Sequence, residues 1–323
     1  MVPPPELDAI LEAHRRIRPH LHRTPILSSR SVDAATGANC LFKCENFQRT
    51  GSFKVRGALN AALGMPDGVP EFVTHSSGNH AAALAFAARL AGRPAHVAMP
   101  VGASAAKKAA AQAYGARVVE CEPTLAAREA AAAQLVAETG GRLVPPFDST
   151  DVVAGQGTCA LEFVEDAGRP LDLLLVPVGG GGLLAGTLIA MANLSPTTRV
   201  VGVEPEAADD AARGFRCGIR QPQVLPVRTM ADGAATAMSE MTFTVMNWLA
   251  HDIVTVPEDS IARAMRFVWE RLKIVIEPTC ALPVAALLEG ILDVRGQTVG
   301  VILTGGNVDL DRLPWLAPRP LPT

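Results

Sequence analysis

Lys54 lies in a segment whose residue types could support chemistry on a carbonyl compound. It follows Thr50, Gly51, Ser52 and Phe53, and we expect a helix to begin near Ser52 with Lys54 in its first turn. An amine held in a cleft can lose its proton and attack a carbonyl carbon to form a Schiff base. Most single lysines are solvated surface charges, so these residues alone leave both interpretations open.

A second candidate segment contains four consecutive glycines. An apolar run at residues 171–178 leads into Gly179, Gly180, Gly181 and Gly182, and Leu183 then opens a predicted helix. Glycine allows a sharp turn and a close approach of the backbone to a ligand. The N–H groups of such a turn and of the helix start favour an anion. The pattern therefore predicts a phosphate site, with an unliganded tight turn as the alternative.

The same segment also fits a loose dinucleotide-binding pattern. Gly180, Gly182 and Ala185 have the spacing G-x-G-x-x-A, and Glu204 follows about twenty residues later, where a ribose-binding acid would lie. A nicotinamide-dependent oxidoreductase is therefore an alternative on this evidence alone. A P-loop is excluded because no Gly-Lys-Ser/Thr follows the glycines.

Predicted strands and helices alternate along the chain, and they must position the Lys54 segment and the glycine turn. This alternation predicts parallel sheets with helices on their faces, in two α/β lobes with a cleft between them. Residues 148–157 are expected to form a loop between the two series. Strands are predicted at residues 39–43, 72–74, 95–99, 117–121, 143–145, 171–178, 198–203 and 298–303. Helices are predicted at residues 6–21, 52–63, 79–90, 105–114, 124–139, 183–194, 258–272 and 282–288.

Composition narrows the classes of function. The net charge of −3 over 323 residues provides no basic field for nucleic acid or an anionic membrane. No apolar stretch is long enough for a membrane helix, and no signal peptide is recognised. The six cysteines form no Cys-x-x-Cys pair, which favours reduced thiols in a cytoplasmic protein.

Several ordered motifs resemble one known family. The segments around Lys54, at residues 76–80, at residues 179–182 and at residues 304–309 resemble the fold-type II (tryptophan synthase β-like) pyridoxal 5′-phosphate (PLP) enzymes. Within that family they are most similar to the serine racemase and serine/threonine dehydratase branch, over nearly the whole chain. The resemblance implies a two-domain α/β fold with parallel sheets flanked by helices and the site between the domains. It implies a large domain of residues 1–70 and 148–323 and a small, mobile, substrate-closing domain of residues 71–147.

The resemblance also assigns roles in cofactor binding. Lys54 would form the Schiff base with PLP, and Phe53 would pack against its ring. Asn79 would reach the phenolic oxygen, and the glycine turn with the Leu183 N–H would hold the phosphate. Thr304 would meet the pyridine nitrogen, and a hydroxyl there favours elimination over transamination.

The substrate would be a small amino acid, bound by residues from several segments. Ser76, Ser77, Gly78, Asn79 and His80 resemble the loop that holds its carboxylate. Arg128 matches a residue near the substrate carboxylate in this branch, and Thr236 takes the place of a serine there.

A divalent-cation site is implied at residues 204–210. Glu204 and Asp210 would provide carboxylate oxygens and Ala208 a backbone carbonyl, a ligand set that suits Mg²⁺ or Ca²⁺. An exposed acidic loop without a metal is the alternative.

The family chemistry predicts a dehydratase (ammonia-lyase) that converts a β-hydroxy amino acid to a 2-keto acid and ammonia. L-serine and L-threonine are the expected substrate type, with threo-3-hydroxyaspartate ammonia-lyase as an alternative. Amino acid (serine) racemase is another alternative, since Ser77 matches the serine that carries a proton on the second face of Cα.

One departure from the family pattern lies in the segment Ala81, Ala82 and Ala83. The family usually has a glutamine at position 82. Its loss predicts a larger or less polar pocket that accepts an aryl substituent, as in phenylserine. The same loss makes ATP binding doubtful, although Arg49, Thr50, Tyr114 and Lys273 match the nucleotide site of relatives. A homodimer without regulation by isoleucine is expected.

Overall fold

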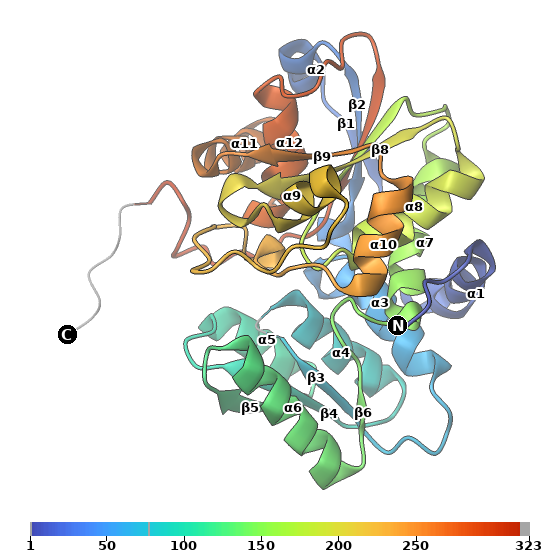
Figure 1. Ribbon diagram of the computed structural model, residues 1–323, viewed down its shortest axis with the longest axis vertical. Coiled ribbons are helices and arrows are strands. Elements are labelled where there is room, and N and C mark those ends of the chain that lie inside the picture. The colour runs from blue at the N-terminus through green and yellow to red at the C-terminus, as the bar shows by residue number, and fades with distance from the viewer. Residues whose placement is uncertain (1, 77, 317–323) are drawn as a thin grey trace.

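Two β-sheets organise the chain in the computed structural model, which describes residues 2–76 and 78–316 (Figure 1). The six-stranded sheet has the order β1-β2-β10-β7-β8-β9, and the four-stranded sheet has the order β5-β4-β3-β6. The strands are β1 Ile26–Ser28, β2 Asn39–Cys44, β3 Phe72–His75, β4 Ala95–Pro100, β5 Arg117–Cys121, β6 Arg142–Leu143, β7 Leu173–Pro177, β8 Arg199–Pro205, β9 Asp252–Val256 and β10 Thr298–Leu303.

Twelve α-helices and six short 3₁₀ segments connect these strands in the described part of the chain. The α-helices are α1 Leu7–Ile17, α2 Arg30–Thr36, α3 Lys54–Gly64, α4 Asn79–Leu90, α5 Ala105–Ala113, α6 Leu125–Thr139, α7 Thr150–Asp166, α8 Gly182–Leu194, α9 Asp210–Cys217, α10 Glu240–Leu249, α11 Glu258–Arg271 and α12 Leu282–Leu288. The 3₁₀ segments are η1 Arg18–His20, η2 Glu45–Phe47, η3 Arg49–Gly51, η4 Glu206–Ala208, η5 Asp232–Ala234 and η6 Pro278–Ala281.

Helices cover both faces of the six-stranded sheet because its strands are apolar on both sides. Leu174 and Val176 of β7 face one buried cluster with α1, α7, α8 and α10. Leu173 and Leu175 face the opposite cluster with α2, α11 and α12. Successive side chains of a strand point to opposite faces, so a continuous apolar strand requires a helix layer on each face. All pairs in this sheet are parallel except β1 with β2.

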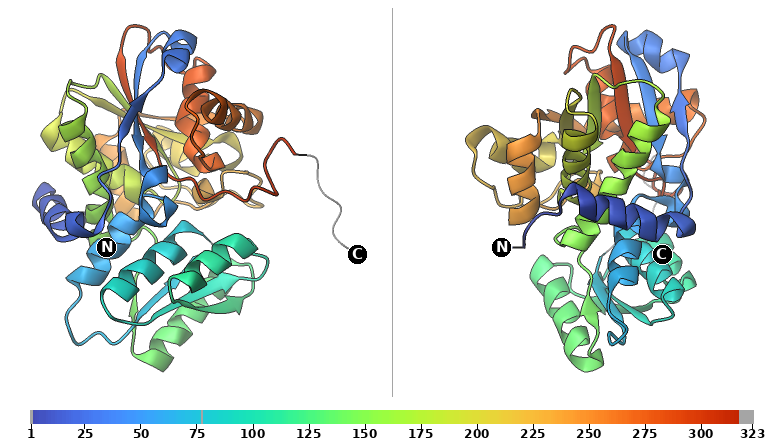
Figure 2. Two further views of the ribbon diagram at one scale, coloured as in Figure 1. Left: turned by 180° about the vertical axis from the view of Figure 1, so that it is seen from behind. Right: turned by 90° about the vertical axis from the view of Figure 1, so that its right-hand side faces the viewer.

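The four-stranded sheet is entirely parallel and occupies the other half of the molecule (Figures 1 and 2). Phe72, Val97 and Met99 pack into a cluster with α3 and α4. Val73 and Ala98 face α6 on the other side. Both sheets therefore have the parallel, helix-covered architecture that the alternating pattern predicts, and the α/β fold class is confirmed.

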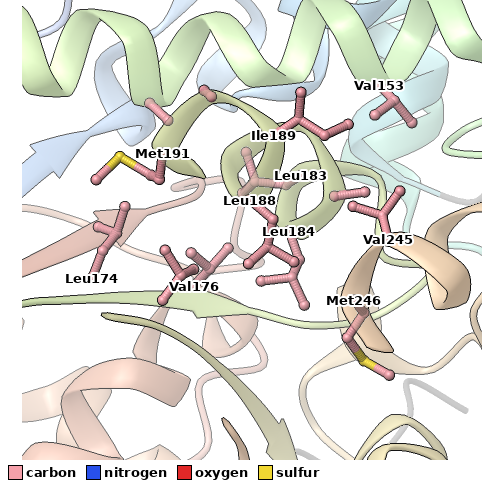
Figure 3. Close-up of a cluster of buried hydrophobic side chains, with 14 of the residues drawn as sticks. Val153, Leu174, Val176, Leu183, Leu184, Leu188, Ile189, Met191, Val245 and Met246 are labelled. Carbon is pink, nitrogen blue, oxygen red and sulfur yellow. The ribbon is translucent and has the colours of Figure 1, made fainter. Parts of the chain in front are cut away.

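Helix α8 begins at the glycine turn and is buried along most of its length. Its residues from Gly182 to Met191 are all buried, and Figure 3 shows Leu183, Leu188 and Ile189 among side chains from the neighbouring sheet and helices. A helix that is apolar all round must be enclosed. The glycine turn is therefore anchored to the interior of the protein.

Some predicted elements differ from the structure. The loop expected at residues 148–157 is instead the start of α7, a helix of 17 residues. Helix α3 begins at Lys54, while Ser52 is extended and pairs with Gly305 rather than capping the helix. Among the described residues, no helix combines the length and apolarity needed to cross a membrane.

Candidate active site

Almost all the predicted cofactor and substrate residues line one cavity of about 780 Å³. They lie in segments that follow strands or begin helices, where parallel α/β folds commonly build their sites. The predicted residues that line the cavity are Phe53, Lys54, Ser76, Gly78, Asn79, His80, Arg128, Gly179, Gly180, Gly181, Gly182, Leu183, Thr236 and Thr304. The predicted Ser77 lies outside the described residues.

Lys54 enters the cavity from the first position of α3. Its Nζ lies 2.9 Å from the carbonyl oxygen of Pro146 and 5.1 Å from the centre of the Phe53 ring. Burial lowers the pKa of the Lys54 amine to about 8 because the protein replaces the water that would solvate its charge. About one amine in ten is then unprotonated at pH 7, against about three in ten thousand for an ordinary lysine.

The backbone around Lys54 is tied to the segment that carries Thr304. The Phe53 N–H donates to the Thr304 carbonyl at 3.0 Å, and Ser52 forms an isolated bridge with Gly305. Residues that are some 250 positions apart in the sequence are therefore fixed together beside the cavity.

The Thr304 side chain provides a hydroxyl to this part of the cavity. It is 2% exposed, and its Oγ1 has no partner with hydrogen-bond geometry in the described structure, although the Cys280 thiol is adjacent. A buried hydroxyl normally has a partner, so the Thr304 oxygen suits a polar atom of a ligand.

The four-glycine turn occupies space that no larger residue could share. A Cβ atom at Gly180 would overlap the Phe147 ring, and one at Gly181 would overlap the Met238 methyl group. Gly181 also has a φ of +82°, in the left-handed region. This turn leads into the first residues of α8, whose N–H groups can bind an anion.

At another edge of the cavity, the start of α4 places Asn79 and His80. The Asn79 side chain contacts Glu277 and Asn307. The Nε2–H of His80 donates to the Val144 carbonyl at 3.0 Å. Burial, followed by the Lys54 charge, lowers the pKa of His80 to about 3, so its imidazole is neutral at physiological pH.

Arg128 and Thr236 line the cavity as the resemblance implies. The Nε of Arg128 is buried without a hydrogen-bond partner among the residues the structure describes. Burial lowers the pKa of the His75 imidazole, and the positive charge of the nearby Arg128 lowers it further. The guanidinium therefore has an N–H donor that an anionic substrate group could use.

Several charged residues of the cavity were missed by the sequence analysis. Glu277, Lys107 and Asp232 line it, and Lys107 forms an ion pair with Asp232. His75 also lines the cavity. These residues belong to no local sequence motif. A position next to a predicted turn or strand end was the one feature that could have indicated a place in the site.

The change predicted for Ala81, Ala82 and Ala83 concerns a pocket beside the main cavity. None of the three is among the residues that line the main cavity, and Ala82 instead borders a separate pocket of about 110 Å³ together with Ser104 and Val308. Ala82 lies one turn after Asn79 on the same face of α4, and both residues border this smaller pocket. Acceptance of an aryl substituent stays a prediction, which turnover of phenylserine tests.

The residues of the predicted metal site lie outside the cavity. Both oxygens of Glu204 accept backbone N–H groups, from Ala211 at 3.2 Å and from Ala212 at 2.9 Å. Glu204 is thus hydrogen-bonded to the start of α9 and is not among the residues that line the cavity. Asp210 is 3% exposed, and its Oδ1 has no hydrogen-bond partner within the described residues.

Comparison with known proteins gives consistent results. Residues 17–305 match the family described as "Pyridoxal-phosphate dependent enzyme". The chain is 46% identical to the β-hydroxyaspartate dehydratase of Paracoccus denitrificans, covering 96% of this chain and 99% of that protein. It is 44% identical to the serine racemase of Rattus norvegicus, covering 96% of each chain. The structure of maize serine racemase superposes with a TM-score of 0.92 at 38% identity, covering 95% of this chain and 94% of that one.

Proposed function

The chain belongs to the family of pyridoxal-phosphate dependent enzymes, and we propose that it is a dehydratase (ammonia-lyase) acting on a β-hydroxy amino acid. One observation carries the proposal: the Lys54 amine, with its lowered pKa, opens into the same cavity as the glycine turn and the Thr304 hydroxyl. An amine with this pKa serves both as a nucleophile toward an aldehyde and as a base near neutral pH.

The residues present fit PLP. The Thr304 hydroxyl is buried without a partner in the described structure, and the glycine turn and the start of α8 line the same cavity. Lys54 would hold the aldehyde carbon, residues 179–183 the phosphate, Phe53 one face of the ring, Thr304 the ring nitrogen and Asn79 the phenolic oxygen. When bound, PLP supplies a conjugated system that withdraws electrons from Cα of the substrate.

The protein's own groups then account for proton movement. With PLP bound, the Lys54 amine would accept the Cα proton, and its pKa of about 8 suits this transfer near neutral pH. Burial keeps the imidazole of His80 neutral near pH 7, so it has no imidazolium proton to donate as a general acid. Loss of the β-hydroxyl and hydrolysis of the product would yield a 2-keto acid and ammonia.

We propose 3-hydroxyaspartate as the preferred substrate. The loop at residues 76–80 would bind the α-carboxylate at the N-terminus of α4, where the helix dipole favours an anion. Arg128, which lines the cavity and has a buried N–H donor without a partner in the described structure, would then bind the second carboxylate. The name of the Paracoccus relative supports this assignment.

A panel of serine, threonine, phenylserine and the isomers of 3-hydroxyaspartate tests the proposal. We expect 2-keto acid and ammonia in equal amounts, with the highest kcat/KM for an isomer of 3-hydroxyaspartate. Failure of every member of the panel to yield keto acid, in protein loaded with PLP, would refute the dehydratase assignment.

Arg128→Met is expected to lower kcat/KM for 3-hydroxyaspartate by about 10²-fold, the effect of losing one charge-assisted contact with a substrate carboxylate. Turnover of serine, which has no second carboxylate, should fall by less than about fivefold. Steady-state kinetics with both substrates measures the difference. Arg117→Met, on the exposed edge of β5, is the control. An equal loss for both substrates would contradict the role of Arg128.

Amino acid racemase is the second candidate, and it is supported by the serine racemases among the relatives. Racemisation requires a proton carrier on the face of Cα opposite Lys54, and Ser77 remains the proposed group. Chiral analysis of serine beside the keto-acid assay separates the two activities.

We also propose a divalent-cation site made by Glu204, the Ala208 carbonyl and Asp210. No group of three or more histidine, cysteine or acidic side chains among the described residues could hold a metal, so the site would depend on two carboxylates, one carbonyl and water. Burial and the mutual repulsion of the carboxylates raise the pKa of Glu204, and burial raises that of Asp210 to about 6. The unpartnered Asp210 oxygen and this repulsion fit a bound cation.

Millimolar Mg²⁺ or Ca²⁺ is expected to raise the Tm of the native protein by a few degrees, because a ligand at about 100 times its Kd adds about 2.7 kcal/mol of stability. Excess chelator should reverse the shift. The Asp210→Asn variant should lose the response, whereas Asp209→Asn, which alters the neighbouring ion pair with Arg213, should keep it. Scanning calorimetry of the three proteins checks this, and a cation response that survives in Asp210→Asn would contradict the site.

Two assembly features remain proposals. Residues 71–147, which contain the whole four-stranded sheet, would form a small domain that closes over the substrate. The chain would form a homodimer. Small-angle scattering with and without substrate, and sedimentation, test these two points.

A further inference from the structure

Three side chains form a continuous hydrogen-bonded row at the edge of the cavity. The Asn307 Nδ2 donates to the Thr50 carbonyl at 2.7 Å and to the Asn79 Oδ1 at 2.9 Å. The Asn79 Nδ2 then donates to Glu277 Oε1 at 2.8 Å. The row links η3, just before Lys54, to the start of α4 and to the residue preceding η6.

The direction of every bond in this row is fixed by the backbone carbonyl at one end. A backbone carbonyl accepts and cannot donate, so the Thr50 oxygen requires the NH₂ group of Asn307 on its side. The same NH₂ group donates to the Asn79 oxygen, so the Asn79 NH₂ group faces Glu277. Burial raises the pKa of Glu277 to about 8, and a carboxyl oxygen accepts from Asn79 in either protonation state. Reversing the Asn79 amide would place its oxygen against Glu277 and its NH₂ group against the NH₂ of Asn307. Two bonds would be lost together.

The surrounding backbone is shaped to admit the row. A Cβ atom at Gly51 would overlap the side chain of Asn307, and one at Gly305 would overlap the carboxyl group of Glu277. Gly51 has a φ of +72°, which is unfavourable for other residues. Glu277 itself is 4% exposed, and the Glu277 N–H donates to the Gly305 carbonyl at 3.0 Å. The positions of Asn307 and Glu277 are therefore closely determined.

We propose that Asn307 and Glu277 are positioning residues that hold the Asn79 amide in one orientation, with its second N–H directed into the cavity. This rests on the proposed function, in which Asn79 meets the phenolic oxygen of PLP. One N–H of the amide is used by Glu277, and Asn79 lines the cavity, so the other N–H is the donor available there. With the opposite orientation, the amide oxygen would face an anionic oxygen and repel it.

Asn307→Asp tests the inference because it preserves shape and replaces the NH₂ group by an acceptor. The new carboxylate faces the Thr50 carbonyl and the Asn79 oxygen, so the row can persist only if the Asn79 amide reverses. We expect the Kd for PLP to rise by about tenfold or more and the visible absorbance of the bound cofactor to lose intensity relative to its near-ultraviolet band. Asn193→Asp, on α8 with a bond to the Ile189 carbonyl, is the matched control and should leave both readouts unchanged.

Glu277 provides an independent pair of variants. Glu277→Gln keeps an oxygen that can accept from Asn79 and should change the Kd for PLP by less than about threefold, whereas Glu277→Met removes the acceptor and should raise it by about tenfold. Equal effects of the two would overturn the inference, as would native affinity and spectrum in Asn307→Asp. If Asn307→Asp does not fold, the Glu277 pair decides. Native protein that fails to bind PLP would instead refute the proposed function, so the two failures are distinguishable.

Discussion

Replacing Lys54 with alanine is expected to lower kcat for elimination by at least about 10³-fold and to abolish covalent retention of PLP. Of the two lysines that line the cavity with the glycine turn, Lys54 has a lowered pKa and Lys107 a raised one. Removing it takes away both the covalent link to the cofactor and the base for the Cα proton. Treatment with borohydride followed by intact-mass measurement should show one cofactor fixed to the native protein and none to the variant.

The control for Lys54 is Lys108→Ala on α5. Lys108 is more exposed and pairs with Glu120, so its loss should leave turnover and borohydride trapping unchanged. Added methylamine, which can replace a missing lysine amine as a base, should restore part of the activity of Lys54→Ala. Native turnover in this variant, or cofactor trapped on another residue, would remove the basis of the proposed mechanism.

The residues that sequence could identify are those whose chemistry depends on a local turn. Lys54 is set by the start of α3, the phosphate site by the turn from β7 into α8, and Asn79 by the start of α4. Each of these arrangements is encoded within a few consecutive residues, but the roles of Asn79 and Lys54 were assigned through the family resemblance. Arg128 and Thr236 were reached through that resemblance alone, since neither lies in a turn with a recognisable pattern.

Residues that reach the site through tertiary structure could not be identified in this way. Glu277 lies more than 190 positions from Asn79 in the sequence, and Lys107 lies 125 positions from Asp232. Helix α7 was also missed, since a loop was expected over its first residues. A Cβ atom at Gly155 would overlap the Arg56 carbonyl, so this glycine serves close packing of α7 against α3, which depends on a distant partner.

The packing of α7 against α3 also encloses a charged cluster beneath Lys54. Arg56 is fully buried, and all five of its N–H donors have acceptors. It forms two-point contacts with Glu45, at 2.8 and 2.8 Å, and with Glu162, at 2.9 and 2.7 Å. Lys43 adds a second cation, 3.0 Å from Glu162. Two cations and two anions thus balance in the interior.

This cluster holds α3 in place two residues after Lys54. Burial alone would raise the pKa of Glu162, but the nearby charges of Arg56 and Lys43 outweigh burial and lower it to about 2. A carboxyl group whose pKa is lower in the folded than in the unfolded protein stabilises the fold above its unfolded pKa, near 4.5. That contribution should decline as the pH falls from about 4.5 toward 2.

Arg56→Met is expected to lower the free energy of unfolding by about 3–5 kcal/mol near neutral pH, because it leaves Glu45 and Glu162 buried with Lys43 as the remaining cation. The difference from the native protein should shrink as the pH falls below about 5, since protonation relieves the unpaired carboxylates. Urea denaturation at a series of pH values measures it. Arg23→Met, which breaks an ion pair whose arginine side chain is 52% exposed, should cost less than about 1 kcal/mol. A similar small cost for Arg56→Met would mean that water or a rearranged side chain replaces the guanidinium, and that α3 is held chiefly by its apolar contacts with α7 and α4.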